Sequence, residues 1–312
     1  MAAVAKQKPI TAIDVELAGD ILRVVNTGLP ELASRNAVDA LTELRLEHEP
    51  IRDFLNLPPN GNHLINSCLL YPPFEQGSDG ALFLASRFAF APYAGTALMA
   101  AATVLAEKQG STLSADQQHF VLDTASGSME VELVRRNIAV THAKWFVSAP
   151  DLLINTQELL RTGGEAVPVS VVNAGLPYLV VDTDKLNIAL GDHSALSDAA
   201  IELSATAGSQ FPMAQFGIGG NYSQYLVMFF TKASDNHIKT VWVSDKGEVA
   251  NSAGGTGALS VLAAGLGNGA LTPDQPALIE APGGTFECQI ARGRASVTAT
   301  VRTVARHVFL PR

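Results

Sequence analysis

The chain has 312 residues, of which 47% are hydrophobic and 16% charged, and its formal net charge at pH 7 is −9. This length accommodates two ordinary domains, and the balance of apolar and charged residues is typical of packed globular layers rather than of disorder. The negative charge comes without a dense stripe of Lys or Arg, so we expect neither nucleic acid nor a membrane surface as a partner.

The N-terminal stretch MAAVAKQKPITAIDV lacks the apolar segment that a secretory signal needs, so we expect a cytoplasmic protein. The most apolar window, residues 81–106, is long enough to suggest a membrane span, but Arg87, Pro92 and Gly95 interrupt it. A strand, a turn and then a buried helix are the better prediction for this window.

Cys68 in NSCLLY and Cys288 in FECQI lie in apolar, strand-like runs, where cysteine is usually a small buried hydrophobe, and we expect no disulfide between them.

Two further segments of the second half predict local structure. GDHSALSDAAIEL from Gly191 is typical of a helix start capped by Ser194 or Ser197, and SDNHIK at 234–239 is typical of a hairpin turn. No set of His, Cys and carboxylate residues has the spacing of metal ligands, so no metal is expected.

Three segments of the first half recur in the same order in the second. VNTGLP at 25–30 returns as VNAGLP at 172–177, YAGTALMAA at 93–101 as GGTGALSVLAA at 254–264, and LDTASGSMEVELVRRNIAVT at 122–141 as IEAPGGTFECQIARGRASVT at 279–298. The copies lie about 150 to 160 residues apart, which is the size of a single domain. The sequence therefore predicts two similar α/β domains, residues 1–145, to which the tail 300–312 can return, and residues 146–299. In each, we expect a sheet wrapped around one long hydrophobic helix.

A Gly-Thr pair precedes each of the two hydrophobic helices, at 95–96 and at 255–256. In the simpler interpretation, small residues merely let a helix start close to a strand. Two copies at equivalent places would also present two helix N-termini, with free backbone N–H groups and positive dipole ends, to the cleft between the domains. Such a cleft suits an anion, most simply the carboxylate of a small molecule.

At this point the motifs resemble those of the proline racemase family, within the larger group that shares the diaminopimelate epimerase fold. ITAIDVELAGDILRVVNTGLP at 10–30 is similar to the family's opening, Ile-Asp-x-His-Thr-x-Gly-Glu-Pro-x-Arg-Val-Val followed by Gly-x-Pro. PPNGNHLINSCLLYPP from Pro58 stands at the family's Arg-Gly-His block, YAGTALMAAATVLAE at its Met-Cys-Gly-His, and ANSAGGTGALS at its Asp-Arg-Ser-Pro-Cys-Gly-Thr-Gly. The resemblance implies a cofactor-independent isomerase or lyase acting on proline or hydroxyproline, with one catalytic cysteine from each domain exchanging protons at the substrate α-carbon.

This sequence departs from the family at the reacting groups. The first cysteine falls on Ala94 and the second on Gly254, and neither side chain can move a proton. The family's His after the first cysteine is Thr96, the Asp that helps to hold the substrate amine is Ala250, and Arg-Gly-His has become Asn-Gly-Asn at 60–62. The dehydratase branch keeps one thiol and replaces the other with a hydroxyl, so its pattern is not met either.

What the resemblance leaves is a carboxylate cradle without its thiols. The residues expected to bind the ligand are Ala94, Gly95, Thr96, Gly254, Gly255, Thr256, Gly257 and Asn62.

Three other residues are candidates to replace the thiols. Glu16 stands at the family's first His and would serve as a base if desolvation raised its pKa, or else it is a solvated residue on an edge strand. His63 and Tyr93 would serve as hydrogen-bond partners or acids. Alternatively, His63 is a turn residue exposed to water, and Tyr93 is an aromatic residue whose ring closes the cleft.

Three hypotheses follow. The first is a divergent family member, an isomerase or lyase, that transfers a proton or eliminates water next to a bound carboxylate without thiols. The second is a non-catalytic relative that binds or senses a metabolite or supports an active homologue. The third is an isomerase similar to the phenazine-biosynthesis branch of the fold, which works through a carboxylate base. In each case we expect a small carboxylate as the partner, and family analogy adds a homodimer.

Overall fold

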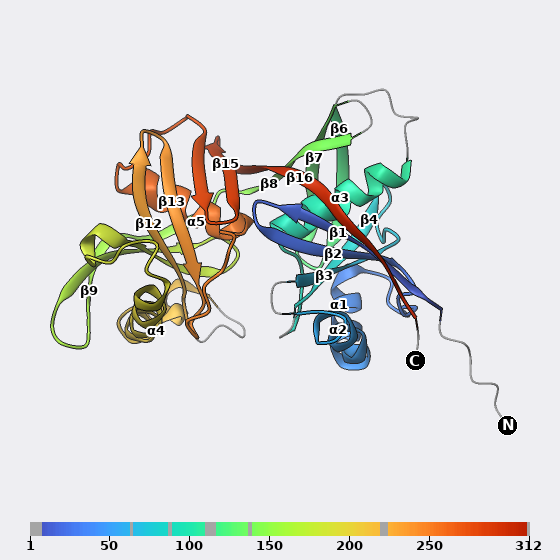
Figure 1. Cartoon of the computed structure of the whole chain (residues 1–312), viewed down its shortest axis with the longest axis horizontal. Coiled ribbons are helices and arrows are strands. Elements are labelled where there is room, and N and C mark those ends of the chain that lie inside the picture. Colours follow the sequence, from blue (N-terminus) through green and yellow to red (C-terminus); the bar gives the residue numbers. More distant parts are fainter. Residues whose placement is uncertain are drawn as a thin grey trace. The chain divides into compact units, whose positions relative to one another are not determined.

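The computed structural model describes residues 8–62, 65–86, 89–109, 117–136, 139–218 and 224–310. Within it the chain forms two units (Figure 1). Unit 1 contains the residues up to Phe146 together with those from Ala299 onward, and unit 2 contains Val147–Thr298. The chain passes from unit 1 to unit 2 within β8 (Ala139–Ser148) and returns within β16 (Arg294–Phe309).

Unit 1 is a sheet wrapped around one helix. Its elements are β1 (Ile10–Leu17), β2 (Asp20–Thr27), α1 (Ala37–Glu47), α2 (Glu49–Asn56), β3 (Ile65–Tyr71), β4 (Gly80–Ala85), β5 (Phe90–Ala91), α3 (Gly95–Gln109), β6 (Gln117–Thr124), β7 (Gly127–Arg136) and β8. The strand order is β1-β2-β3-β4-β6-β7-β8, and the last part of β16 pairs with β1. Because α3 is apolar on all sides, it is buried from Gly95 to Val104 and packs against strands from β1 to β7. The helices α1 and α2 cover the opposite face of the sheet.

Unit 2 repeats this plan. Its elements are β9 (Asp151–Leu160), β10 (Ala166–Asn173), β11 (Pro177–Asp182), η2 (Thr183–Lys185), α4 (His193–Gln210), η3 (Met213–Phe216), β12 (Leu226–Ser234), β13 (His237–Val243), α5 (Gly255–Gly267), β14 (Ala277–Ala281), β15 (Gly284–Ala291) and the first part of β16. The strands follow the order β9-β10-β11-β12-β13-β14-β15-β16. The buried helix α5 packs against one face of this sheet, and α4 packs against the other.

Corresponding strand pairings occur around the buried helix of each unit. In unit 1, α3 connects β5 to β6, and β6 lies parallel to β4, whereas in unit 2 α5 connects β13 to β14, which lies parallel to β13. An antiparallel hairpin follows each helix, formed by β6 with β7 and by β14 with β15. Unit 2 has one strand inserted at this place, because β11 lies between β10 and β12 where unit 1 pairs β2 directly with β3.

Local predictions have mixed outcomes. Strand, turn and buried helix are confirmed for residues 81–106 by β4 and α3, and the hairpin at 234–239 is confirmed by the turn between β12 and β13. The predicted caps of α4 are wrong. Asp192 is the N-cap, because its carboxylate accepts the Ala195 N–H at 3.1 Å, whereas the Ser197 hydroxyl donates to the Gly247 carbonyl. No helix in the described ranges is long and apolar enough to cross a membrane.

Candidate functional site

The first half of the predicted cradle is the start of α3. The Ala94 carbonyl accepts the Leu98 N–H at 3.1 Å, so the helix begins at Gly95 and the N–H groups of its first turn have no acceptor within the helix. Gly95 and Thr96 are buried, and no acidic side chain lies in this first turn to neutralise the positive end of the helix dipole. The start of α3 therefore provides amide donors and positive potential.

Aromatic packing explains why position 95 is glycine. The Trp145 ring, fully buried on β8, lies so close to Gly95 that a Cβ there would clash with its six-membered ring. The half-buried Tyr93 ring lies 6.0 Å from the Trp145 ring, centroid to centroid, at an interplanar angle of 60°. Tyr93, a candidate acid, is thus part of the aromatic packing beside the helix start.

The second half of the predicted cradle is the start of α5. The Gly254 carbonyl accepts the Ala258 N–H at 3.0 Å, and the Ser252 hydroxyl accepts the Gly254 N–H at 3.1 Å. Gly254 has φ of 63° and ψ of 160°, a conformation that residues with a Cβ rarely adopt. The first turn again carries no acidic residue. A cysteine at position 254 would therefore strain this backbone as it stands.

Thr256 is held by a residue that sequence reasoning missed. The Tyr178 hydroxyl lies 2.8 Å from Thr256 Oγ1, and Tyr178 is buried on β11. Gly257 packs against Met228, since a Cβ at position 257 would lie 3.1 Å from the Met228 sulfur. The sequence gives one indication that Tyr178 belongs to the site, because Tyr178 directly follows the second copy of the Gly-Leu-Pro repeat.

Neither cysteine of the chain replaces the family thiols. Cys68 lies on β3 and Cys288 on β15, and both are free and fully buried. Burial raises the pKa of each thiol well above its usual range, so both stay protonated at neutral pH. Their prediction as buried strand residues is confirmed.

Glu16 has partners away from α3. Its Oε1 atom accepts the Gly19 N–H at 3.0 Å, and its Oε2 atom lies 3.6 Å from Arg302 Nη2. Its side chain is 25% exposed, and β1 lies between β2 and β16, so the alternative of a residue on an edge strand is wrong. These contacts favour a role in the β1–β2 turn, and a role for Glu16 as a base stays a prediction.

The remaining candidates lie in the loop before β3. Asn62 is exposed, and its backbone carbonyl accepts the Ile65 N–H at 3.3 Å. His63 lies outside the described residues.

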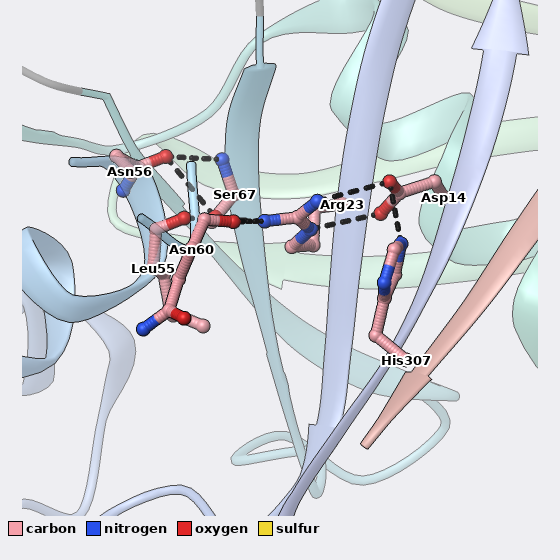
Figure 2. A network of polar contacts seen from close by, with 7 residues as sticks. All are labelled: Asp14, Arg23, Leu55, Asn56, Asn60, Ser67 and His307. Atoms are coloured by element: carbon pink, nitrogen blue, oxygen red, sulfur yellow. Dashed lines mark hydrogen bonds and ion pairs between the residues drawn. The ribbon is translucent and has the colours of Figure 1, made fainter. Parts of the chain in front are cut away.

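The loop with Asn60 is fastened to the sheet by a buried ion pair, shown in Figure 2. Arg23 Nε and Nη2 donate to the two oxygens of Asp14 at 2.9 and 3.1 Å, and both side chains are less than 10% exposed. Arg23 Nη1 donates to the carbonyls of Leu55 and Asn60. His307, from β16, contacts the second Asp14 oxygen at 2.8 Å. The Arg23 guanidinium, which projects from β2, therefore holds the Asn60 end of the loop against the sheet.

The opening motif contained this pair, although sequence reasoning did not single it out. Asp14 and Arg23 are charged residues within apolar strands, and they lie directly opposite each other in the register of β1 and β2. Buried charges of opposite sign at facing strand positions usually pair. Two charged residues within apolar strands could therefore have indicated this ion pair from the sequence.

One group of potential metal ligands occurs in the described part of the chain, formed by Glu43, Glu47 and His48. Glu43 already accepts hydrogen bonds from the Ser34 hydroxyl at 2.5 Å and from the N–H groups of Ala33 and Ser34 at 2.8 and 2.9 Å. These bonds, the Ser34 hydroxyl first, lower the pKa of Glu43 to about 2. The carboxylate therefore fastens the preceding loop to α1, and this arrangement does not call for a metal.

Comparisons with known proteins cover nearly the whole chain. A family profile described as Proline racemase matches residues 12–309. The trans-3-hydroxy-L-proline dehydratase of Bacillus thuringiensis subsp. konkukian (strain 97-27) is 24% identical over 311 residues, which are 97% of this chain and 92% of that protein.

Two solved structures extend the comparison. A hydroxyproline epimerase from Agrobacterium vitis, with bound trans-4-hydroxy-L-proline, matches with a TM-score of 0.79 and 20% identity over 97% of this chain and 93% of that one. A phenazine biosynthesis protein of the PhzF family from Enterococcus faecalis matches with a TM-score of 0.57 and 13% identity over 97% of this chain and all (100%) of that one. At these identities the structures establish the mixed α/β fold alone.

Proposed function

Because the chain belongs to the proline racemase family, we propose that it binds a small, proline-like carboxylate at the starts of α3 and α5 and acts on it without thiols, as an isomerase or lyase. The observation that carries the proposal is the pair of matched helix starts, each with amide donors in its first turn and no acidic residue there. The relatives support the ligand class, since one is a trans-3-hydroxy-L-proline dehydratase and another holds trans-4-hydroxy-L-proline.

The resemblance places the family's two thiols at Ala94 and Gly254, so the proposed reaction proceeds without them. In an isomerisation, a base would take the α-proton, the helix-start amides would stabilise the charge on the carboxylate, and a proton would return to the other face. In an elimination, the base would take the α-proton and an acid would protonate the departing hydroxyl group, which leaves as water. Glu16, His63 and Tyr93 are the proposed proton carriers.

The test is solvent exchange followed by NMR. The protein is incubated in deuterated water with L-proline, trans-4-hydroxy-L-proline and trans-3-hydroxy-L-proline, and loss of the α-proton signal is measured. We expect exchange with at least one of the three, and loss of that exchange in Glu16→Gln or in His63→Gln. Glu31→Gln serves as the control, because Glu31 is an exposed carboxylate of the same unit. Absence of exchange with every substrate would contradict catalysis.

A second candidate function is binding without catalysis. The observation in its favour is that the polar partners of Glu16 in the described ranges, Gly19 and Arg302, lie outside α3. Calorimetry with the same three compounds separates the two functions. Saturable binding without exchange, weakened in Thr256→Val, supports a binding protein, and absence of binding contradicts both functions.

A further inference from the structure

Unit 2 contains a cavity of about 290 Å³ on the α4 face of its sheet. The cavity lies between the loop before α4 and the neighbouring strands β13 and β14, and its walls include Leu190, His193, Lys239, Val241, Glu280 and Pro282. Its volume lies just below the usual range of ligand pockets, roughly 300 to 1,000 Å³, so it suits a ligand of amino-acid size rather than a larger one.

This cavity is separate from the start of α5. Val241 belongs to the apolar core beneath α4, together with Val227 and Phe229. Gly257, in the first turn of α5, instead packs against Met228, the residue between those two. Because alternate strand residues point to opposite faces, the sheet of unit 2 lies between the cavity and the start of α5.

Two opposite charges face each other at the cavity wall. Lys239 and Glu280 are directly opposite in the parallel pair of β13 and β14, and Lys239 Nζ lies 3.7 Å from Glu280 Oε1. Their side chains are 51% and 36% exposed. An ion pair this long and this exposed contributes little to stability, so a ligand can replace it at low cost.

One imidazole, that of His193, completes the polar lining, and a second one, that of His237, supports Glu280 from outside it. His237 Nε2 lies 2.7 Å from Glu280 Oε2 and holds that carboxylate in place. His193, the first residue of α4, is exposed at the wall and has no polar side-chain partner among the described residues. The cavity thus offers an ammonium group, an imidazole and a carboxylate above an apolar wall.

We propose that this cavity is a second small-molecule site, which binds a zwitterionic amino acid of proline size. The ligand carboxylate would bind Lys239 and His193, its ammonium group would bind Glu280, and its hydrocarbon part would pack against Val241 and Pro282. The site goes beyond the proposed function, because it needs neither the helix starts nor any reaction.

The experiment observes His193 directly. The chain has seven histidines, so the ring signals of protein labelled at histidine with ¹³C can be resolved, and His193→Gln assigns the relevant one. L-proline is titrated as the probe. Tetrahydrofuran-2-carboxylate, which has oxygen in place of the ring nitrogen, tests the need for the ammonium group, and pyrrolidine tests the need for the carboxylate.

We expect a saturable shift of the His193 signal with L-proline, and at least tenfold weaker binding of both analogues. Lys239→Gln and Glu280→Gln should each weaken L-proline binding at least tenfold. Lys232→Gln should not, because Lys232 is a similarly exposed lysine on β12 that pairs with Asp235. The shift should persist in Thr256→Val, so a failure of the predicted cradle does not affect this test.

Three results would overturn the proposal. They are the absence of a saturable His193 shift, equal affinity for L-proline and tetrahydrofuran-2-carboxylate, and unchanged L-proline affinity in both Lys239→Gln and Glu280→Gln.

Discussion

The buried ion pair of unit 1 allows a quantitative test of how the loop before β3 is held. Arg23→Met removes the guanidinium partner of the buried Asp14, which is 7% exposed and keeps His307 as a side-chain contact, and it removes a donor from the carbonyls of Leu55 and Asn60. Removing one partner of a buried ion pair costs about 3 to 5 kcal/mol, because the other charge stays buried without full compensation. We expect the free energy of unfolding of unit 1 to fall by this amount.

The double variant Asp14→Leu with Arg23→Met separates the charge from the packing. With both charges removed, the desolvation cost disappears, and we expect the double variant to recover about 2 kcal/mol of the loss seen in Arg23→Met. Arg302→Met is the control, because Arg302 is 73% exposed and lies 3.6 Å from Glu16. It should cost less than about 0.5 kcal/mol.

The assay is urea unfolding followed by tryptophan fluorescence. The chain has two tryptophans, Trp145 in unit 1 and Trp242 in unit 2, so a Trp242→Phe background reports unit 1 alone. A loss below about 1 kcal/mol for Arg23→Met, or a double variant as unstable as the single one, would refute the reasoning from buried charge.

Three further predictions concern packing, pH and thiol chemistry. Gly95→Ala should destabilise unit 1 by about 1 to 3 kcal/mol, because the new methyl group meets Trp145, and urea unfolding with an unchanged midpoint would contradict this. The pKa of Glu43 is lowered from 4.5 to about 2. The ionised carboxylate therefore contributes its full stabilisation above pH 4.5, and this contribution is lost as the pH falls towards 2. Urea unfolding of Glu43→Gln should show a free energy of unfolding that depends less on pH in this interval. Cys68 and Cys288 should react with a thiol reagent only in denaturant, and rapid labelling of the native protein would show that they are accessible.

The repeated framework could be predicted from sequence because the duplicated segments carry strong local signals. The Gly-Thr pairs before two apolar runs mark the starts of α3 and α5, and Asp235 and Asn236 mark the hairpin between β12 and β13. These signals depend on residues close together in the chain. Turn residues and apolar runs restrict the local backbone, whatever the rest of the protein does.

The contacts of the candidate site could not be predicted in the same way. Gly95 is required by Trp145 and Thr256 is held by Tyr178, and in both cases the partner is a long way off in the sequence. Asp14 contacts His307, which is 293 residues away. No local propensity encodes such pairs, because they depend on strand register and on the return of β16.

The return of β16 also determines the order in which the two units can be completed during synthesis. Residues 301–309 pair with β1, and they leave the ribosome only after the whole of unit 2. Unit 2 is continuous in sequence, so it can fold while β1 still lacks one neighbouring strand and Asp14 still lacks His307. Unit 1, whose synthesis begins first, is therefore completed last. A premature stop codon after residue 298 would damage unit 1 and spare unit 2.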